Sequence, residues 1–499
     1  MTMADLPPWL DLRSRQLQLG LFGLAALAWG VPFAIHTAWP LRFEDAMIVL
    51  RYARHLAAGE GFVFNLGEKV LGVTTPLQTL LSTLIFLAGS DPATAPAWQN
   101  LAGLVFLVAE AGLLLLLLHR LGLRAAALPV ALLALSGFYG GYLYLGMETH
   151  LFMTLVLLVL WVELGATPRP YLLGVLLGLA FLTRYDAALL ALLLGLGAMI
   201  RERALPWRLT LGFFLVVTPW LLFAQLYFGS ILPQPLAAKE SYFSLGAYLG
   251  QVYGQWRETT RAICAVFSRI DRANHLVAIS FPLVVAAGAA LLGRDPRWRW
   301  WLLYPFLHLG IYAAIGSDPG FTWHLYLLGP FFLLFGASLA SVVADLLRRR
   351  WLARWPERAL TSLLVVGLLV PLSWHLFQQA RYRFEPDPHT RQLQEMATWL
   401  AANYPPQTSL LQPSIGILGY ESGLRMIDHA GLVTPGLYFW NDSACTPLAE
   451  VFTRFAPDLV LASPWTRTSA AEMAAAGYAP AHEFAEPFHY TLFARQASR

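Results

Sequence analysis

The sequence contains few cysteines and few charged residues. Its 499 residues include two cysteines, Cys264 and Cys445, which lie far apart and lack the spacing of metal ligands. This arrangement argues against both a zinc site and a disulfide framework. Charged residues make up only 13% of the chain, and the formal net charge of +4 does not indicate a nucleic-acid partner.

The chain is instead rich in apolar residues. Hydrophobic residues make up 57% of it, and the mean hydropathy is +0.54. Runs of roughly 20 apolar residues, repeated along a chain, are typical of membrane spans. The composition therefore predicts a polytopic α-helical membrane protein with the lipid bilayer as a partner.

Arginines between the apolar runs predict the topology. The first run, 17–39, follows Arg13 and Arg15 and is too long for a signal-peptide core, so we expect an uncleaved span with a cytoplasmic N-terminus. The stretch 76–88 is short for a span. If it does not cross, the later arginine clusters all lie in the cytoplasm, which predicts about eleven spans and an outer C-terminus. The expected later spans are 96–118, 125–140, 149–165, 170–183, 187–200, 207–228, 275–293, 299–316, 321–346 and 359–378.

We expect two domains, a transmembrane domain at 1–378 and an extracytoplasmic α/β domain at 379–499. The transmembrane domain includes a first outer loop at 40–95. In this loop, 45–58 has apolar residues at helical spacing and predicts an amphipathic helix in the membrane interface. The polar composition after Phe377 predicts the second domain. Its expected helices are 389–403 and 448–455, and its expected strands are 409–411, 424–427, 458–462 and 490–493.

Two adjacent carboxylates, Glu44 and Asp45, follow the first span. A carboxylate beside a membrane is a functional candidate because its burial in lipid is costly, and a general base would suit this position. The alternative is a helix N-terminus, where acidic side chains complement the dipole. Glu148 also has two interpretations, as a helix cap or as a carboxylate that binds an acceptor or a divalent cation.

Basic side chains are predicted on the same outer face. Arg184 lies two residues before Asp186 and forms either a local ion pair or a bidentate grip on a phosphate. Lys239 follows two prolines and contacts either a lipid phosphate or headgroups. Asp318 and His324 complete this set, and for His324 an ordinary helix-end histidine is the alternative.

The motifs together resemble a known family. Glu44-Asp45-Ala46, Arg51-Tyr52-Ala53 and Gly67-Glu68-Lys69-Val70 resemble the first-loop signature of bacterial membrane glycosyltransferases of the GT-C superfamily. The nearest types are mycobacterial-type arabinofuranosyltransferases and protein mannosyltransferase-like proteins. Further resembling stretches are Gly146–Thr149, Leu182–Asp186, Leu232–Lys239, Gly316–His324, Gly416–Gly423 and Ile427–Val433.

This resemblance implies a GT-C fold and an inverting transfer at the outer face of the bacterial inner membrane. The sugar, arabinofuranose, mannose or similar, would move from a polyprenyl-phosphate donor to a hydroxyl of a cell-envelope glycan, lipid or protein. No cofactor is certain, and a divalent cation is possible although no convincing ligand cluster is seen. By the resemblance, the base is Asp45 or else Glu44. The donor phosphate would be bound by Arg184, Lys239 and Arg51. The acceptor cavity would be lined by Glu148, Asp186, Asp318, His324 and Lys69.

Two other functions stay open at this point. One is an oligosaccharide or O-antigen-type ligase that uses a diphosphate-linked donor, and the other is a transporter or flippase of lipid-linked sugars. Transporters place polar residues near the membrane midplane on broken helices. The predicted clustering of ionisable residues at one face favours an enzyme.

Overall fold

The structure is a computed structural model that describes most of the chain. The described residues are 15–36, 42–135, 145–238, 286–294, 298–314, 327–350, 388–437, 446–462 and 469–496. Contacts divide the chain into two compact units. Unit 1 comprises Met1–Thr37, Leu101–Val217 and Ser241–Arg383, and unit 2 comprises Ala38–Asn100, Thr218–Glu240 and Phe384–Arg499. Unit 2 thus joins most of the predicted first outer loop to the C-terminal segment, a grouping that the sequence did not predict.

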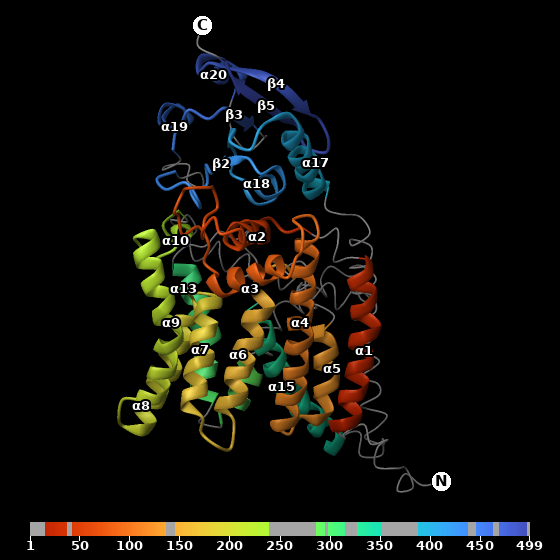
Figure 1. Ribbon diagram of the computed structural model, residues 1–499. Coiled ribbons are helices and arrows are strands. Elements are labelled where there is room, and N and C mark those ends of the chain that lie inside the picture. The colour runs from red at the N-terminus through yellow and green to blue at the C-terminus, as the bar shows by residue number, and fades with distance from the viewer. Residues whose placement is uncertain are drawn as a thin grey trace. The chain divides into compact units, whose positions relative to one another are not determined.

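Unit 1 is built of apolar helices (Figure 1). Helix α6 packs against α7, α7 and α13 pack against α8, and α1 and α15 pack against α5. Most of these helices begin and end close to the predicted spans. The helices are α1 (Arg15–His36), α5 (Arg124–Leu135), α6 (Thr149–Glu163), α7 (Pro170–Thr183), α8 (Ala187–Glu202), α13 (Arg299–Ala314) and α15 (Gly329–Arg350).

Two further helices, α4 (Ala95–Arg120) and α9 (Trp207–Phe228), contribute residues to both units. Among the described residues, these two are long and apolar enough to cross a membrane. Helices α3, α6 and α7 are apolar but shorter. The count of about eleven spans stays a prediction, as does the side of the membrane on which each loop lies, and the predicted span 359–378 lies outside the described residues.

Helix α2 (Glu44–Ala57) is the first helix of unit 2 and matches the predicted amphipathic helix. Glu44 and Asp45 occupy its first turn and Arg54 and His55 its last turn, so both ends complement the helix dipole. Most of its apolar side chains are buried, and it packs against α3 (Pro76–Leu87), which Pro76 opens at a position where no backbone N–H is needed.

The C-terminal part of unit 2 is an α/β arrangement with a five-stranded sheet in the order β2-β1-β3-β5-β4. Strand β1 (Ser409–Leu411) pairs in parallel with β2 (Arg425–Ile427) and β3 (Leu459–Ala462), while β5 (Tyr490–Arg495) runs antiparallel to β3 and β4 (Tyr478–Phe484). The four predicted strands are confirmed. The two predicted helices are also present, as α17 (Pro388–Asn403) and α19 (Leu448–Phe455). Strand β4 and the short helices α10 (Gln234–Ala238), α18 (Gly416–Ser422) and α20 (Ala470–Ala475) were not predicted.

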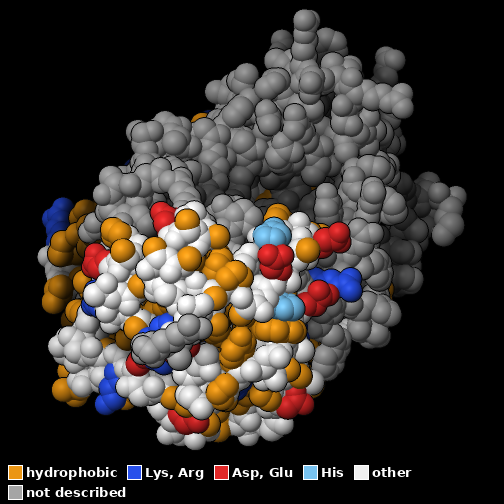
Figure 2. Space-filling model, turned by 90° about the horizontal axis from the view of Figure 1, so that it is seen from above, with side chains coloured by type: hydrophobic (Ala, Val, Ile, Leu, Met, Phe, Trp, Pro, Cys, Tyr) orange, Lys and Arg blue, Asp and Glu red, His pale blue; other side chains and the backbone are white. Residues whose placement is uncertain are grey.

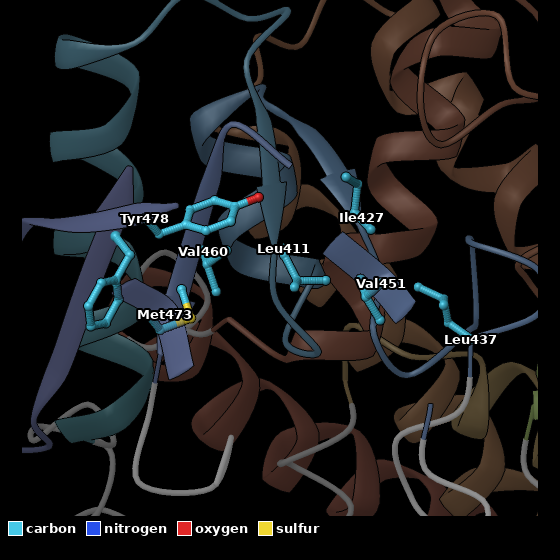
Figure 3. Close-up of a cluster of buried hydrophobic side chains, with 8 residues drawn as sticks. Leu411, Ile427, Leu437, Val451, Val460, Met473 and Tyr478 are labelled. Atoms are coloured by element: carbon cyan, nitrogen blue, oxygen red, sulfur yellow. The ribbon is translucent and has the colours of Figure 1, made fainter. Parts of the chain in front are cut away.

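One face of this sheet carries a compact hydrophobic core (Figure 3). Side chains from all five strands, from α19 and from α20 meet there. Burial of these side chains holds the helices against the sheet. The core consists of Leu411, Ile427, Leu437, Val451, Val460, Met473, Tyr478 and Phe493. On the surface seen in Figure 2, hydrophobic side chains are interspersed with acidic, basic and histidine side chains.

Candidate active site

The predicted carboxylate pair lies in the first turn of α2. Glu44 and Asp45 are adjacent, so their side chains leave the helix about 100° apart. Both residues are half-buried. Glu44 Oε1 accepts a hydrogen bond from the Gly416 N–H at 2.5 Å, and Glu44 Oε2 accepts one from the Ile417 N–H at 3.1 Å. Glu44 therefore caps the first turn of α18, while Asp45 points in another direction around α2.

Burial changes the ionisation of this region. It raises the pKa of Glu44 to about 7, and the nearby carboxylates of Asp45 and Asp428 add to the rise. The two backbone N–H groups act in the opposite direction, because they favour the charged form. Burial also raises the pKa of Asp428 to about 7, against hydrogen bonds from the backbone of 430–433. Unit 2 therefore holds two carboxyl groups that titrate near neutral pH.

We expect unit 2 to become more stable as the pH falls from 8 to about 5. A carboxyl group with a raised pKa in the folded state contributes stability that is full below its unfolded pKa and is lost as the pH rises through about 7. Burial lowers the pKa of His55, which acts in the opposite direction at acidic pH. Tyr490 lies in the field of Glu44 but is neutral in this range.

The measurement is the rate of hydrogen–deuterium exchange in unit 2 peptides, corrected for the intrinsic pH dependence of exchange, at pH values from 5 to 8. Comparing the wild type with Glu44→Gln separates the contribution of Glu44 from that of His55, because the histidine is the same in both. The variant should show a weaker pH dependence of protection. Equal pH dependences in the two proteins would contradict the raised pKa of Glu44.

Arg51, a predicted phosphate ligand, has a different environment from the one expected. The residue is 3% exposed, and its guanidinium donates to three backbone carbonyls, those of Phe64 at 2.8 Å, Leu424 at 2.7 Å and Gly419. Burial lowers its pKa to about 9. These contacts favour a structural role, because phosphate binding would leave buried carbonyls without their donor. The phosphate assignment of Arg51 stays a prediction that these contacts do not support.

Two other residues of the first-loop motif contact the same C-terminal segment. The Asn65 side chain donates to the Met426 carbonyl at 2.8 Å and accepts from the Met426 N–H at 3.0 Å, in the manner of a neighbouring strand. Glu68 accepts a hydrogen bond from Arg425 Nε at 2.7 Å. Lys69, predicted to line the acceptor cavity, is exposed, and its Nζ lies 4.7 Å from the centre of the Tyr227 ring.

Unit 1 brings together three predicted site residues that are separated in sequence. Arg184, between α7 and α8, donates from Nη1 to Glu148 Oε1 at 2.6 Å, and Glu148 is the residue that precedes α6. Its Nε and Nη2 donate to Asp186 at 3.0 to 3.2 Å. Arg184 and Glu148 are both buried. The ion-pair interpretation of Arg184 and Asp186 is confirmed, and Glu148 joins the pair to form what we call the Arg184 cluster.

Helix α13 supplies residues that the sequence reasoning missed. The Tyr312 hydroxyl donates to Asp186 Oδ2 at 2.7 Å and accepts from Arg184 Nη2 at 3.1 Å. His308 lies one turn earlier, with its ring 4.7 Å from that of Tyr312, and Tyr304 precedes His308 by another turn. The recurrence of polar aromatic residues every four positions in this apolar helix was the signal available in the sequence. The hydroxyl of Tyr304 is buried and has no hydrogen-bond partner in the described part of the chain.

A second missed pair joins α4 and α6. His150 Nδ1 lies 2.9 Å from Glu110 Oε2, and both side chains are almost fully buried. Glu110 interrupts a long apolar helix, and an ionisable residue in such a helix is a functional candidate. The sequence alone therefore contained a signal for Glu110, although it gave none for its partner.

Three predicted residues, Lys239, Asp318 and His324, lie outside the described residues. Within the residues that the structure does describe, no group of three or more histidine, cysteine or acidic side chains is arranged to hold a metal ion. The possible divalent cation stays an untested expectation.

Comparisons with known proteins agree with the motifs. A family model described as Domain of unknown function (DUF8728) matches residues 378–496. Over 254 residues the chain is 28% identical to a terminal β-(1→2)-arabinofuranosyltransferase from Corynebacterium glutamicum, a match that covers 44% of this chain. The match covers 36% of the length of that relative.

Solved structures match over almost the whole chain. The apo form of ArnT from Cupriavidus metallidurans has a TM-score of 0.62 at 15% identity, with 95% of this chain and 97% of ArnT covered. ArnT bound to undecaprenyl phosphate has a TM-score of 0.57 at 14% identity, with 96% and 98% covered. The archaeal oligosaccharyltransferase AglB from Archaeoglobus fulgidus, in complex with an inhibitory peptide and a dolichol-phosphate, has a TM-score of 0.57 at 14% identity, with 95% and 74% covered.

At these identities the similarity is one of fold. Structural neighbours with this fold are polytopic membrane proteins, which supports the predicted membrane location. The chain therefore shares the fold of ArnT and AglB, in agreement with the fold that the motif resemblance implied.

Proposed function

We propose that the chain is an inverting glycosyltransferase that moves a sugar from a polyprenyl-phosphate donor to an acceptor hydroxyl at the outer face of the membrane. The observation that carries this proposal is the match to ArnT along nearly the whole chain, since that protein was solved with undecaprenyl phosphate. The dolichol-phosphate bound to AglB supports the same class of donor, and the arabinofuranosyltransferase relative supports the transfer of a sugar. Arabinofuranose, mannose or a similar sugar would be transferred to a cell-envelope glycan, lipid or protein.

Asp45 is the general base in this proposal. A hydroxyl acceptor must lose its proton as the glycosidic bond forms, and a carboxylate within hydrogen-bond reach performs that task. The phosphate is a competent leaving group, so a general acid is not obligatory. Among the two candidates, Asp45 is favoured because both oxygens of Glu44 already accept backbone N–H groups.

Arg184 binds the donor phosphate in this proposal. Its planar guanidinium suits two parallel bonds to phosphate oxygens. Glu148 and Asp186 hold the guanidinium in one orientation, and a phosphate would exchange for one of the present partners. The carboxylates of Glu148 and Asp186 carry more charge than the single guanidinium of Arg184. Binding of a phosphate therefore needs another cation, and we propose that Lys239 supplies it. Asp318, His324 and Lys69 remain proposed acceptor-side residues.

A second candidate function is transfer of an oligosaccharide from a lipid-linked donor to a peptide. The match to AglB, an oligosaccharyltransferase solved with a peptide, favours it. The first function transfers a single sugar and the second an oligosaccharide. The ligase alternative predicted from the sequence would take that oligosaccharide from a diphosphate-linked donor.

The test is a screen of the purified full chain against polyprenyl-phosphate sugars and diphosphate-linked oligosaccharides, with donor consumption as the readout. We expect the wild type to consume a monophosphate-linked sugar only. The Arg184→Lys variant should lose this consumption, because lysine keeps the positive charge but lacks the planar guanidinium that can form two parallel bonds to phosphate. Arg201→Lys is the matched control, because Arg201 is an exposed arginine of the same unit paired with Glu163. Consumption of the diphosphate donor alone would favour the second function, and consumption of neither would overturn both.

A further inference from the structure

The structure points to different roles for the two adjacent carboxylates of α2, Glu44 and Asp45. We propose that Glu44 is a positioning residue whose bonds to α18 hold the first turn of α2, and with it Asp45, in the orientation used for proton transfer. This inference rests on the proposed function, in which Asp45 is the base. It assigns the C-terminal segment a direct role in ordering that base.

The first step in the argument is the pair of bonds itself. Each Glu44 oxygen accepts one N–H from the start of α18, at 2.5 Å from Gly416 and 3.1 Å from Ile417. The first N–H groups of a helix have no partner within the helix, so a carboxylate there satisfies them and gains from the dipole. Hydrogen bonds that involve a charged group are among the stronger ones in proteins.

The second step is the close approach of the two backbones. A Cβ atom placed on Gly416 would overlap the main-chain carbonyl of Glu44. Only glycine therefore lets α18 come this near to α2. Because Gly416 contacts the main chain of Glu44 as well as its side chain, movement of α18 would move the backbone that carries Asp45.

The third step is that the same segment anchors α2 and the following loop at other points. Arg51, seven residues after Glu44 and thus on the same face of α2, donates to the carbonyls of Gly419 and Leu424. Asn65 pairs with the backbone of Met426. Glu44, Arg51 and Asn65 thus bind main-chain groups of one short stretch, 416–426. These contacts make the loop and the C-terminal segment of unit 2 one structural body.

Asp45 lies beside this anchored face. It is next to Glu44 in the chain and about 100° around the helix. A base must be held within a few tenths of an ångström of its working position, and side chains behind it supply that order. Glu44 is the nearest such support in the sequence, because it is tied to a second element of unit 2.

The test compares Glu44→Gln, Gly416→Ala and the double variant in the purified full chain. Gln keeps the size of Glu44 but only one acceptor oxygen, and Ala at 416 forces the backbones apart. We expect each single variant to lower kcat about tenfold, corresponding to the loss of one hydrogen bond. The double variant should lose little more than either single one, because both changes break the same contact. The acid limb of the kcat–pH profile, which reports the base, should persist in all three.

Hydrogen–deuterium exchange supplies a readout that does not depend on activity. In both single variants the peptides covering 42–52 and 415–422 should exchange about tenfold faster, while peptides within 149–163 keep their wild-type rates. Glu395→Gln is the control for charge loss, since Glu395 is exposed on α17 and forms a local surface pair with Arg391. It should leave both activity and exchange unchanged.

Two results would overturn the positioning role. One is unchanged exchange of 42–52 in Glu44→Gln. The other is loss of the acid limb in that variant, which would make Glu44 the base. A wild type that transfers no sugar from any donor would instead refute the proposed function, and the exchange measurement would still decide whether Glu44 orders the first turn of α2.

Discussion

The Asp45→Asn variant is expected to lose sugar transfer by a factor of about 10² to 10⁴, the range typical for removal of a general base. Asparagine has nearly the shape of aspartate but cannot take up the acceptor proton. The fold of α2 should be retained, since the bonds between Glu44 and α18 do not involve Asp45. The measurement is the initial rate of product formation by the purified variant with a polyprenyl-phosphate sugar.

The matched control for this prediction is Glu60→Gln. Glu60 lies shortly after α2 in the same loop, is exposed and faces His55 at 3.8 Å. Its substitution removes one negative charge from the loop without touching the first turn of α2, so transfer should stay close to the wild-type rate. Full transfer by Asp45→Asn would refute the assignment of Asp45 as the base.

Substitution of Arg184 by methionine is expected to destabilise unit 1 by about 3–5 kcal/mol, the usual cost of breaking a buried ion pair by removing one partner. Glu148 lies 2.6 Å from the guanidinium and is itself buried, so the variant leaves a carboxylate in the interior without its cation. Asp186 loses the same partner, although Tyr312 still donates a hydrogen bond to it.

The measurement is the unfolding free energy of the detergent-solubilised chain, followed together with donor consumption. Arg201→Met is the control, because Arg201 is an exposed arginine and a surface pair contributes about 0–1 kcal/mol. A second variant, Glu148→Gln with Arg184 intact, separates stability from binding. It should cost less than Arg184→Met because the cation keeps Asp186. Equal stability of Arg184→Met and Arg201→Met would contradict the proposed energetic role of the cluster.

Much of the secondary structure was predictable from local patterns. The amphipathic spacing in 45–58 predicts α2, since an apolar stripe with a period near 3.6 residues buries only as a helix. The four expected strands are short apolar runs between turn residues. Helix α18 was not predicted, because its seven residues include two glycines and rely on Glu44 and the neighbouring α17 for support.

The candidate site was predictable only in part. Arg184 and Asp186 are two residues apart at the end of an apolar run, so their pairing is visible in the sequence. Tyr312 lies 126 residues after Asp186, and no local pattern connects them. Arg51 shows the converse case. Its type and motif suggested a phosphate ligand, whereas its guanidinium binds the carbonyls of residues more than 360 positions away.

The sequence by itself determined the class of protein and singled out several of its ionisable side chains as candidates. The apolar composition, the first-loop motif and the scarcity of charge require a helical membrane protein with a few conspicuous ionisable side chains, because each such side chain is costly near lipid. The tertiary structure decided what each of those that it describes contacts. Glu44 and Arg51 bind the backbone of the C-terminal segment, whereas Arg184 gathers two carboxylates and a tyrosine from three parts of unit 1. The physical reason is that hydrogen bonds and ion pairs act over a few ångströms in space, and only folding brings distant positions of the chain within that range.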